Sequence, residues 1–514
     1  RSGDFVLGRV SPTAIPIPTQ RNRNPSLASF RDNHPMTHIF RSTILGIFLL
    51  AIFSSIANPA FAAPPNVVFV LCDDLGYGDL GCYGHPTIAT PRLDQMAAEG
   101  QRWTSFYSPA SVCSPARAGY LTGRYPIRAS CAGVNRRRVF FDNCPNGMPT
   151  DEVTIAEMLR DAGYATMCVG KWHLGHQPEY LPTNQGFDQY FGIPYSNDMD
   201  AARPRPPYFD LSRTSWDKSI DPALYNVPLI ESNEALKYEV VERPVQQETL
   251  TKRLTEKAVS FIKGNADKPF FLYVAHPQPH IPLFASKPYR GKSRRGLFGD
   301  VLNELDDSIG SILDALKSSG VDDNTLVIFT SDNGPWATFN YHGGSQGPLN
   351  GSKGTSWEGG FRVPAIFRMP GKIPAGSIVR DMGCGLDLLP TIANLTGATL
   401  PKDRVIDGVN LSETLLSNAP SARKEFVFYN GREVWAARQG SWKLHLETAR
   451  PKGPMKHDPP ILFQVDVDPS EKYNINGHAP EAMEALPKLI EKHVLEMKPG
   501  PDLMKAIDEE ARIK

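Results

Sequence analysis

The chain has 514 residues, of which 41% are hydrophobic and 21% charged, with 46 Pro and 42 Gly. This ordinary globular composition excludes disordered, collagen-like and coiled-coil proteins, and the length suffices for one large domain and a smaller one. The 55 basic residues balance 55 acidic ones, so no excess of positive charge favours a nucleic acid as a partner.

Residues 1–62 have the features of a signal peptide behind a spurious or extended start. The first methionine is Met36, Arg41 follows it, and an apolar run extends from Ile44 to Ile56. Ala60-Phe61-Ala62 then supplies the small residues of a cleavage site. The apolar run is short for a bilayer span, so we expect an exported protein, periplasmic or secreted, without a stable membrane anchor. A retained anchor is the alternative.

Four short apolar runs predict buried strands, and polar residues follow each of them. Continuous hydrophobic runs of this length are typical of strands that are covered on both faces, as in a parallel α/β sheet. The runs are Asn66–Leu71, Ala165–Val169, Phe270–Val274 and Leu326–Phe329.

Helices are predicted between these strands. Thr90-Pro91 is typical of a helix N-terminus, and that helix should end at Gly100. Thr154 and Glu157 form a capping box for a second helix, which should end at Gly163. The alternation of strand and helix predicts the α/β class, in which ligands bind at the carboxyl ends of the strands.

The pattern changes from about residue 421. Short, partly alternating runs separated by turns predict a small antiparallel sheet, followed by a helix from about Pro480 to Met497. The expected organisation is therefore 1–62 as the targeting segment, 63–420 as the catalytic domain and 421–514 as a small α+β subdomain. The predicted strands are Glu425–Tyr429, Glu433–Ala437, Trp442–Leu446 and Leu462–Asp466.

Two of the predicted strands end in oxygen-bearing side chains. Asp73 and Asp74 follow the first strand, and Asp332 and Asn333 follow the last. Each aspartate alone could be a helix cap or a turn residue. Together they predict a site for a hard divalent cation, Ca²⁺ or Mg²⁺, since zinc prefers histidine or cysteine ligands.

Four further side chains near the strand ends can bear or transfer positive charge: Lys171, His173, His280 and Lys353. Lone lysines are usually solvated and lone histidines are more often structural. Lys171 and His173, however, alternate along an extended segment and so can share one face. A metal, lysines and histidines together are typical of a site for an anionic ester. These residues alone do not distinguish a phosphate ester from a sulfate ester.

A motif supplies that distinction. Cys113-Ser-Pro-Ala-Arg117 is followed at a fixed offset by Thr122-Gly-Arg124. This resembles the signature C-x-P-x-R-x-x-x-x-T-G-R of type I sulfatases. In that family a separate maturation enzyme oxidises the cysteine to Cα-formylglycine.

The resemblance extends over almost the whole chain after residue 62 and is to arylsulfatase A-like members. Ser196 matches a serine that lies near the bound sulfate in that group, whereas Asn197 replaces the histidine that follows it there. The matching segments, in family order, are Asp73–Gly81, Gly170–Gly175, Tyr190–Asp198, Pro279–Pro282, Ser331–Gly334, Gly351–Gly360, Asp387–Thr391 and Asp468–Glu471.

The resemblance implies an alkaline-phosphatase-like fold, with a large mixed, mostly parallel sheet flanked by helices and a smaller C-terminal antiparallel sheet. It also implies that one hydroxyl of a hydrated formylglycine at position 113 attacks the sulfur. His173 then deprotonates the second hydroxyl, and His280 protonates the leaving alcohol. The other implied roles are sulfate binding by Lys171, Lys353, His280 and Ser196, orientation by Arg117, and Ca²⁺ coordination by Asp73, Asp74, Asp332, Asn333 and the modified Cys113.

The expected function is therefore hydrolysis of sulfate monoesters, of a sulfated carbohydrate or of aryl sulfates. The run Arg136–Arg138 could attract a sulfated glycan, although charge runs are usually just solvated loops. Two alternatives remain: a formylglycine-dependent phosphonate monoester hydrolase or phosphodiesterase, and a non-catalytic binder of sulfated glycans.

Overall fold

The computed structural model describes residues 63–134, 137–201, 220–233, 237–450 and 453–508. The expected targeting segment, 1–62, and Arg136 lie outside these residues. The described residues belong to one compact unit. In the described part, no helix has the length and apolar character needed to cross a membrane.

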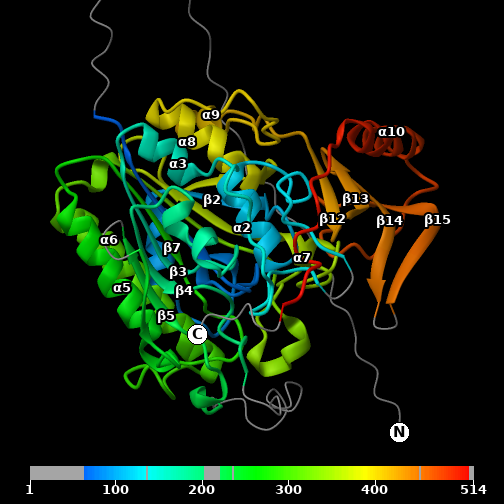
Figure 1. Ribbon diagram of the computed structural model, residues 1–514. Coiled ribbons are helices and arrows are strands. Elements are labelled where there is room, and N and C mark those ends of the chain that lie inside the picture. Colours follow the sequence, from blue (N-terminus) through cyan, green and yellow to red (C-terminus); the bar gives the residue numbers. More distant parts are fainter. Residues whose placement is uncertain (1–62, 135–136, 202–219, 234–236, 451–452, 509–514) are drawn as a thin grey trace, which may run out of the picture. The chain divides into compact units, whose positions relative to one another are not determined.

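A large sheet of eleven strands forms the centre of this unit (Figure 1). Its strands are β1 (Asn66–Cys72), β2 (Gln101–Tyr107), β3 (Ala165–Lys171), β4 (Gln189–Ile193), β5 (Leu229–Asn233), β6 (Glu239–Glu242), β7 (Phe270–Ala275), β8 (Thr325–Ser331), β9 (Arg362–Arg368), β10 (Ser377–Val379) and β11 (Gly383–Cys384). Their spatial order is β10-β2-β9-β8-β1-β7-β3-β4-β5-β6, with β11 beside β2.

The middle of this sheet is parallel. Strands β8, β1, β7, β3 and β4 run in one direction, whereas β9, β5 and β6 pair antiparallel to their neighbours. All four strands predicted from the apolar runs are present in it, as β1, β3, β7 and β8. The prediction of a mixed, mostly parallel sheet is confirmed.

Helices cover both faces of the sheet, as the alternating side chains of β1 require. Val67, Phe69 and Leu71 pack with residues of α2, α3, α8 and α9, while Val68 and Val70 pack with α1, α5 and α6. The helices are α1 (Pro91–Glu99), α2 (Cys113–Thr122), α3 (Ile155–Asp161), α5 (Gln247–Gly264), α6 (Leu297–Ser318), α7 (Glu358–Phe361), α8 (Leu388–Thr396), α9 (Ser412–Ser417) and α10 (Pro480–Glu496). Short 3₁₀ segments lie at Gly81–Tyr83, Pro178–Tyr180, Pro182–Asn184, Pro222–Leu224, Asp322–Asn324, Ala337–His342 and Gly385–Asp387.

Both predicted helices are present, although α3 ends at Asp161, two residues before the expected Gly163. The first helix, α1, starts with its proline at N1 and stops at Gly100. At α3 the Thr154 hydroxyl accepts from the backbone N–H of Glu157 at 3.1 Å, and the Glu157 carboxylate accepts from the N–H of Thr154 at 2.8 Å. This reciprocal pair is the capping box expected from the sequence.

A second, four-stranded antiparallel sheet lies in the C-terminal part and consists of β12 (Glu425–Asn430), β13 (Glu433–Gln439), β14 (Trp442–Arg450) and β15 (Gly453–Gln464). Its core continues into the large sheet, since Phe426 and Phe428 contact Tyr107 and Phe361. Leu486 of α10 belongs to the same core.

Two strands differ from the sequence-based expectation. Strand β14 continues to Arg450, beyond the expected end at Leu446. The last strand was expected at Leu462–Asp466, but β15 starts at Gly453 and ends at Gln464. Its early part contains Pro454, Pro459 and Pro460, and prolines in a sequence indicate a loop more often than a strand. Because β15 is the edge strand of its sheet, a missing backbone N–H on its outer side costs no ladder hydrogen bond.

Candidate active site

Several of the predicted site residues lie at the carboxyl ends of the parallel strands. Asp73 and Asp74 follow β1, and Asp332 follows the neighbouring strand β8. Lys171 ends β3, and His280 lies in the segment after β7. Strands β8, β1, β7 and β3 are consecutive in the sheet, so these side chains meet at one edge.

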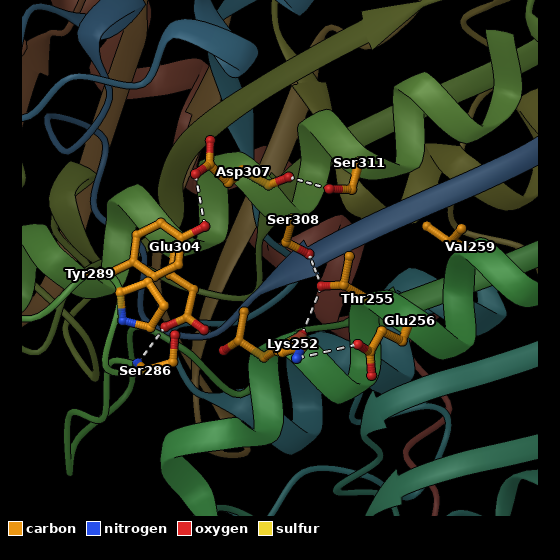
Figure 2. Close-up of a pocket in the computed structure, with 12 residues that line it drawn as sticks. Lys252, Thr255, Glu256, Val259, Ser286, Tyr289, Glu304, Asp307, Ser308 and Ser311 are labelled. Atoms are coloured by element: carbon orange, nitrogen blue, oxygen red, sulfur yellow. Dashed lines mark hydrogen bonds and ion pairs between the residues drawn. The ribbon is translucent and has the colours of Figure 1, made fainter. Parts of the chain in front are cut away.

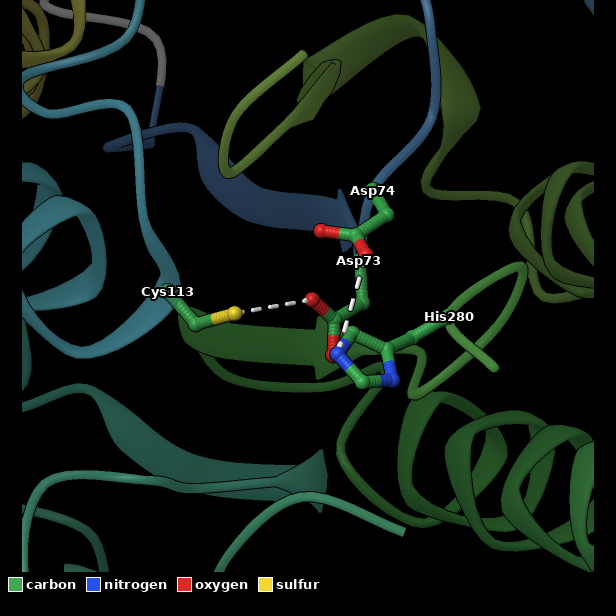
Figure 3. A group of neighbouring side chains, drawn as sticks. All are labelled: Asp73, Asp74, Cys113 and His280. Carbon is green, nitrogen blue, oxygen red and sulfur yellow. Dashed lines mark hydrogen bonds and ion pairs between the residues drawn. The ribbon is translucent and has the colours of Figure 1, made fainter. Parts of the chain in front are cut away.

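Cys113 lies at the centre of this edge. It is the first residue of α2, is 2% exposed, and its Sγ lies 3.3 Å from Asp73 Oδ1 and 3.5 Å from Lys353 Nζ. Figure 3 shows its side chain directed at Asp73. Burial, with the nearby carboxylate of Asp73, raises the pKa of the Cys113 thiol well above its usual value. An unmodified Cys113 would therefore be a neutral thiol, which is a poor nucleophile.

Asp74 is surrounded by lysine, asparagine and histidine side chains. Lys353 Nζ lies 2.7 Å from its Oδ1, and the Asn333 amide donates to the same oxygen at 2.6 Å. His280 Nε2 lies 3.6 Å from Asp74 Oδ2. The backbone of Asp74 has a φ of 60°, a left-handed conformation that is uncommon outside glycine.

Asp332 is held by a fully buried arginine. The Nε and Nη2 groups of Arg117 donate to Asp332 Oδ2 at 3.0 and 2.8 Å, and its Nη1 donates to the carbonyl of Lys171 at 2.7 Å. Arg117 therefore joins α2, β8 and β3. Burial and the neighbouring Asp73 carboxylate raise the pKa of Asp332 to about 7, although Arg117 and Lys171 oppose this shift.

The pKa of Asp73 is shifted in the opposite direction from that of Asp332. Burial alone would raise its pKa, but Lys171, His280, Arg117 and Lys353 together hold that pKa well below its usual value. Lys171 pairs directly with Asp73 and also donates to the Ser196 hydroxyl at 3.0 Å. Asp73 is therefore ionised in the site.

His173 lies close to these groups, and among the described residues it forms no hydrogen bond or ion pair with a carboxylate. Its Nε2 lies 3.0 Å from the carbonyl of Phe140, and its buried Nδ1 has no hydrogen-bond partner among the described residues. Burial, reinforced by Lys171 and Arg117, lowers its pKa well below the usual value. His173 has a φ of 59°, so it reaches the site through a bend and not by simple strand alternation with Lys171.

A cavity of about 370 Å³ opens onto Cys113. Four of the site residues proposed from the sequence line it: His173, Ser196, His280 and Lys353. Its remaining walls come from Val112, Arg138, Val139, Phe141, Asp198, Met199 and Trp336.

Trp336 is a cavity residue that the sequence analysis did not identify. Its ring centroid lies 5.3 Å from that of His280, and Lys353 Nζ lies 4.3 Å from the centre of the Trp336 ring. The only available signal was its position, three residues after Asn333 at a strand end.

The residue that follows Ser196 forms hydrogen bonds that link two segments of the chain. Asn197 is fully buried, and its amide nitrogen donates to Gln247 Oε1 and to the Pro282 carbonyl, both at 3.1 Å. It ties the β4 segment to the segment that carries His280.

The predicted oxygen ligands fit a divalent cation. Three carboxylates converge, and the Oδ1 of Asn333 is buried with no hydrogen-bond partner in the part of the chain that the structure describes. The ligand atoms of Asp73, Asp74, Cys113 and His280 all lie within 4.8 Å of one another (Figure 3). Asn333 and Asp332 extend this group, so the donors are mainly the oxygens that Ca²⁺ and Mg²⁺ prefer.

A larger cavity, of about 500 Å³, lies between α5 and α6 and is lined by hydroxyl and carboxylate side chains (Figure 2). Thr255 and Ser308 form a hydrogen bond of 2.6 Å there, and Tyr289 donates to Asp307 at 2.8 Å. No side chain of the strand-end cluster lines this cavity. We therefore place the candidate active site at Cys113.

All seven cysteines lie within the described residues, and none of them forms a disulfide. Cys131 and Cys144, which are close in sequence, are both buried thiols.

Comparison with known proteins agrees with this geometry. A family model described as Sulfatase matches residues 65–398, and one described as the C-terminal region of aryl-sulfatase matches residues 421–513. Arylsulfatase A of Homo sapiens is 40% identical over 463 residues, which cover 84% of this chain and 88% of that protein. The N-acetylgalactosamine-6-sulfatase of Canis lupus familiaris is 36% identical over 498 residues, covering 90% and 92%.

A solved structure gives the same result for the fold. The PsFucS1 sulfatase from Pseudoalteromonas sp. superposes with a TM-score of 0.75 at 29% identity, covering 85% of this chain and 92% of that one. The alkaline-phosphatase-like fold expected from the sequence is thereby confirmed. With both family models matched in chain order and relatives similar over most of their length, the chain is an enzyme that belongs to the sulfatase family.

Proposed function

We propose that this enzyme hydrolyses sulfate monoesters with a formylglycine derived from Cys113 and a resident Ca²⁺ ion. The position of Cys113 carries the proposal. Its Sγ lies at the N-terminus of a buried helix, at 3.3 Å from Asp73 and 3.5 Å from Lys353, at the base of the cavity. The partial positive charge of the helix N-terminus favours an anion at this point.

A hydrated formylglycine at this position would supply a geminal diol as the nucleophile. A neutral buried thiol could not take over this role. Asp73, Asp74, Asp332 and Asn333 would hold the cation, together with the modified side chain. A bound Ca²⁺ would neutralise sulfate oxygens and polarise the nucleophile. Ca²⁺ suits the site better than Mg²⁺, because Mg²⁺ usually keeps several waters and few protein ligands.

The remaining side chains have separate roles in the proposal. Lys171, Lys353 and Ser196 bind the sulfate oxygens, and Arg117 fixes the position of Asp332. His173 accepts a proton. It can do so because its lowered pKa keeps the imidazole neutral. His280 donates a proton to the leaving alcohol from Nε2 of its protonated form, because its Nδ1–H already donates to the Ile281 carbonyl at 2.5 Å. Burial and Lys353 lower the pKa of His280, whereas the carboxylates of Asp74 and Asp73 oppose this shift and favour the protonated form.

The proposed natural substrate is a sulfated carbohydrate, although aryl sulfates would also fit. Support comes from the relative named N-acetylgalactosamine-6-sulfatase and from a cavity large enough for a sugar unit, with Trp336 and Phe141 as flat apolar walls. Arg138, from the arginine run noted in the sequence, lines the same cavity.

We further propose export of the protein, with residues 63–420 as the catalytic domain and 421–514 as the C-terminal subdomain. The signal-peptide pattern between Met36 and Ala62 supports export. An exported chain would meet sulfated glycans, and it would require a formylglycine-generating enzyme as a transient partner.

The mass of the peptide that contains Cys113 tests the proposal, using protein expressed with a formylglycine-generating enzyme. Conversion of thiol to aldehyde lowers the mass by about 18 Da. Converted protein should release sulfate from a panel of sulfated sugars and aryl sulfates, and Cys113→Ala should not. Faster turnover of matched phosphate or phosphonate esters would favour the phosphonate hydrolase alternative. Converted protein that binds sulfated glycans without turnover would favour the non-catalytic binder.

A further inference from the structure

The segment that carries Lys353 is held by the C-terminal sheet. Ser356 and Glu358 follow Lys353 closely in the chain. Lys443 of β14 donates from Nζ to the Ser356 carbonyl at 2.9 Å and lies 2.9 Å from Glu358 Oε1. Both Lys443 and Glu358 are 0% exposed, so this ion pair has no access to water.

A second contact from the C-terminal part completes the attachment. Glu471 Oε2 accepts from the backbone N–H of Glu358 at 2.7 Å, and its Oε1 lies 3.1 Å from Lys443 Nζ. The same oxygen lies 2.7 Å from His445 Nε2, and the His445 ring lies against Trp357 at 4.6 Å. The residues on both sides of Trp357 are thus fixed by side chains of β14 and of the segment after β15.

Glu358 also connects this network to the strand that leads toward Cys113. The Tyr107 hydroxyl, at the end of β2, donates to Glu358 Oε2 at 2.6 Å, and Arg438 of β13 donates to that hydroxyl at 2.5 Å. Burial would raise the pKa of Glu358, but Lys443, Arg362 and Arg438 lower it to about 2. The carboxylate therefore stays charged, and it orders the two segments that flank the site.

We propose that Lys443 and Glu471 are positioning residues: through Glu358 and Ser356 they fix the segment from which Lys353 reaches Asp74 and Cys113. This inference rests on the proposed role of Lys353 in sulfate binding. A buried pair that loses one partner leaves an uncompensated charge, so its neighbours must rearrange. A shift of about 1 Å in a catalytic group can cost about 100-fold in rate.

A double-mutant cycle tests the inference. Lys443→Met keeps the length of the side chain but removes its charge, and Lys353→Ala removes the group that is positioned. We expect Lys443→Met alone to lower kcat/KM for an aryl sulfate by about 10- to 100-fold. In the Lys353→Ala background the same change should cost less than about twofold, because the group it acts on is already absent. Peptide mass must show equal conversion of Cys113 in every variant.

Leu486→Ala is the matched control, since Leu486 is an apolar side chain of α10 that is buried against the same sheet and takes no part in the ion pairs of Lys443. It should lower the Tm but leave kcat/KM within about twofold. If Lys443→Met does not fold, Glu471→Gln, which keeps the side-chain volume, replaces it in the cycle.

Equal losses from Lys443→Met in both backgrounds would overturn the positioning role while leaving the proposed function intact. If Lys353→Ala itself retains the wild-type kcat/KM, the proposed role of Lys353 is wrong and this inference fails with it.

Discussion

His276 should make the stability of the enzyme depend on pH in a way that one substitution can isolate. It directly follows β7, is 0% exposed, and its Nε2 lies 3.3 Å from the Ser308 hydroxyl. Its Nδ1 is buried and has no hydrogen-bond partner among the residues that the structure describes. Burial lowers the pKa of His276 from 6.5 to about 4, because a proton on Nδ1 would be a charge without solvation.

The sign of the effect follows from the lowered pKa. Between pH 6.5 and pH 4 the unfolded chain binds a proton at His276 that the folded protein does not bind, so the free energy of unfolding decreases as the pH falls. Relative to pH 7.5, the loss is about 2 kcal/mol at pH 5 and about 3 kcal/mol at pH 4. For a chain of this length, 1 kcal/mol corresponds to roughly 1 °C in Tm.

The assay compares the Tm of the wild type and of His276→Gln from pH 7.5 to pH 4. Glutamine can keep a hydrogen bond to Ser308 but does not titrate. The Tm of the variant should therefore fall about 2 to 3 °C less than that of the wild type over this range. All other titrating groups are common to both proteins and cancel in the comparison. Parallel Tm curves would refute the argument that His276 is kept neutral by burial.

Three further outcomes are expected. His280→Gln should lower kcat/KM by about 10²- to 10⁴-fold for sugar sulfates but much less for aryl sulfates with acidic phenols, because a good leaving group needs no proton; equal losses on both substrates would contradict the acid role. Removal of divalent metal with EDTA should lower the Tm, and Ca²⁺ at about 100 times its Kd should restore about 2.7 kcal/mol; an unchanged Tm would argue against a resident cation. Gly192→Ala should destabilise the fold by about 1–3 kcal/mol, since a Cβ there would lie 1.8 Å from the Gly170 carbonyl oxygen; a Tm equal to that of the wild type would show that β3 and β4 can move apart.

The sequence predicted those parts of the structure that depend on short stretches of chain. The strand β1 and the capping box of α3 each need only a few neighbouring residues, and both were predicted correctly. The convergence of Asp73 and Asp332 also followed, because parallel strands end at the same edge of a sheet.

Contacts between distant segments could not be predicted. Lys443 and Glu358 are 85 residues apart, and nothing in either local sequence indicates that they pair. Trp336 was missed for a similar reason, since its contact with His280 depends on the path of a loop. The left-handed backbone at His173 is a third case, because a β-strand pattern gives no sign of where the chain bends.

The proline-containing edge of the C-terminal sheet has a consequence for self-association. An edge strand offers unpaired N–H and C=O groups to which a strand from another molecule can add. In β15, Pro454, Pro459 and Pro460 provide no N–H donors, and the register shifts opposite this stretch. An incoming strand would find an interrupted row of hydrogen-bonding groups, so this edge of the sheet is protected against pairing with a strand of another enzyme molecule. Replacement of these prolines by β-branched residues would remove that protection without touching the active site.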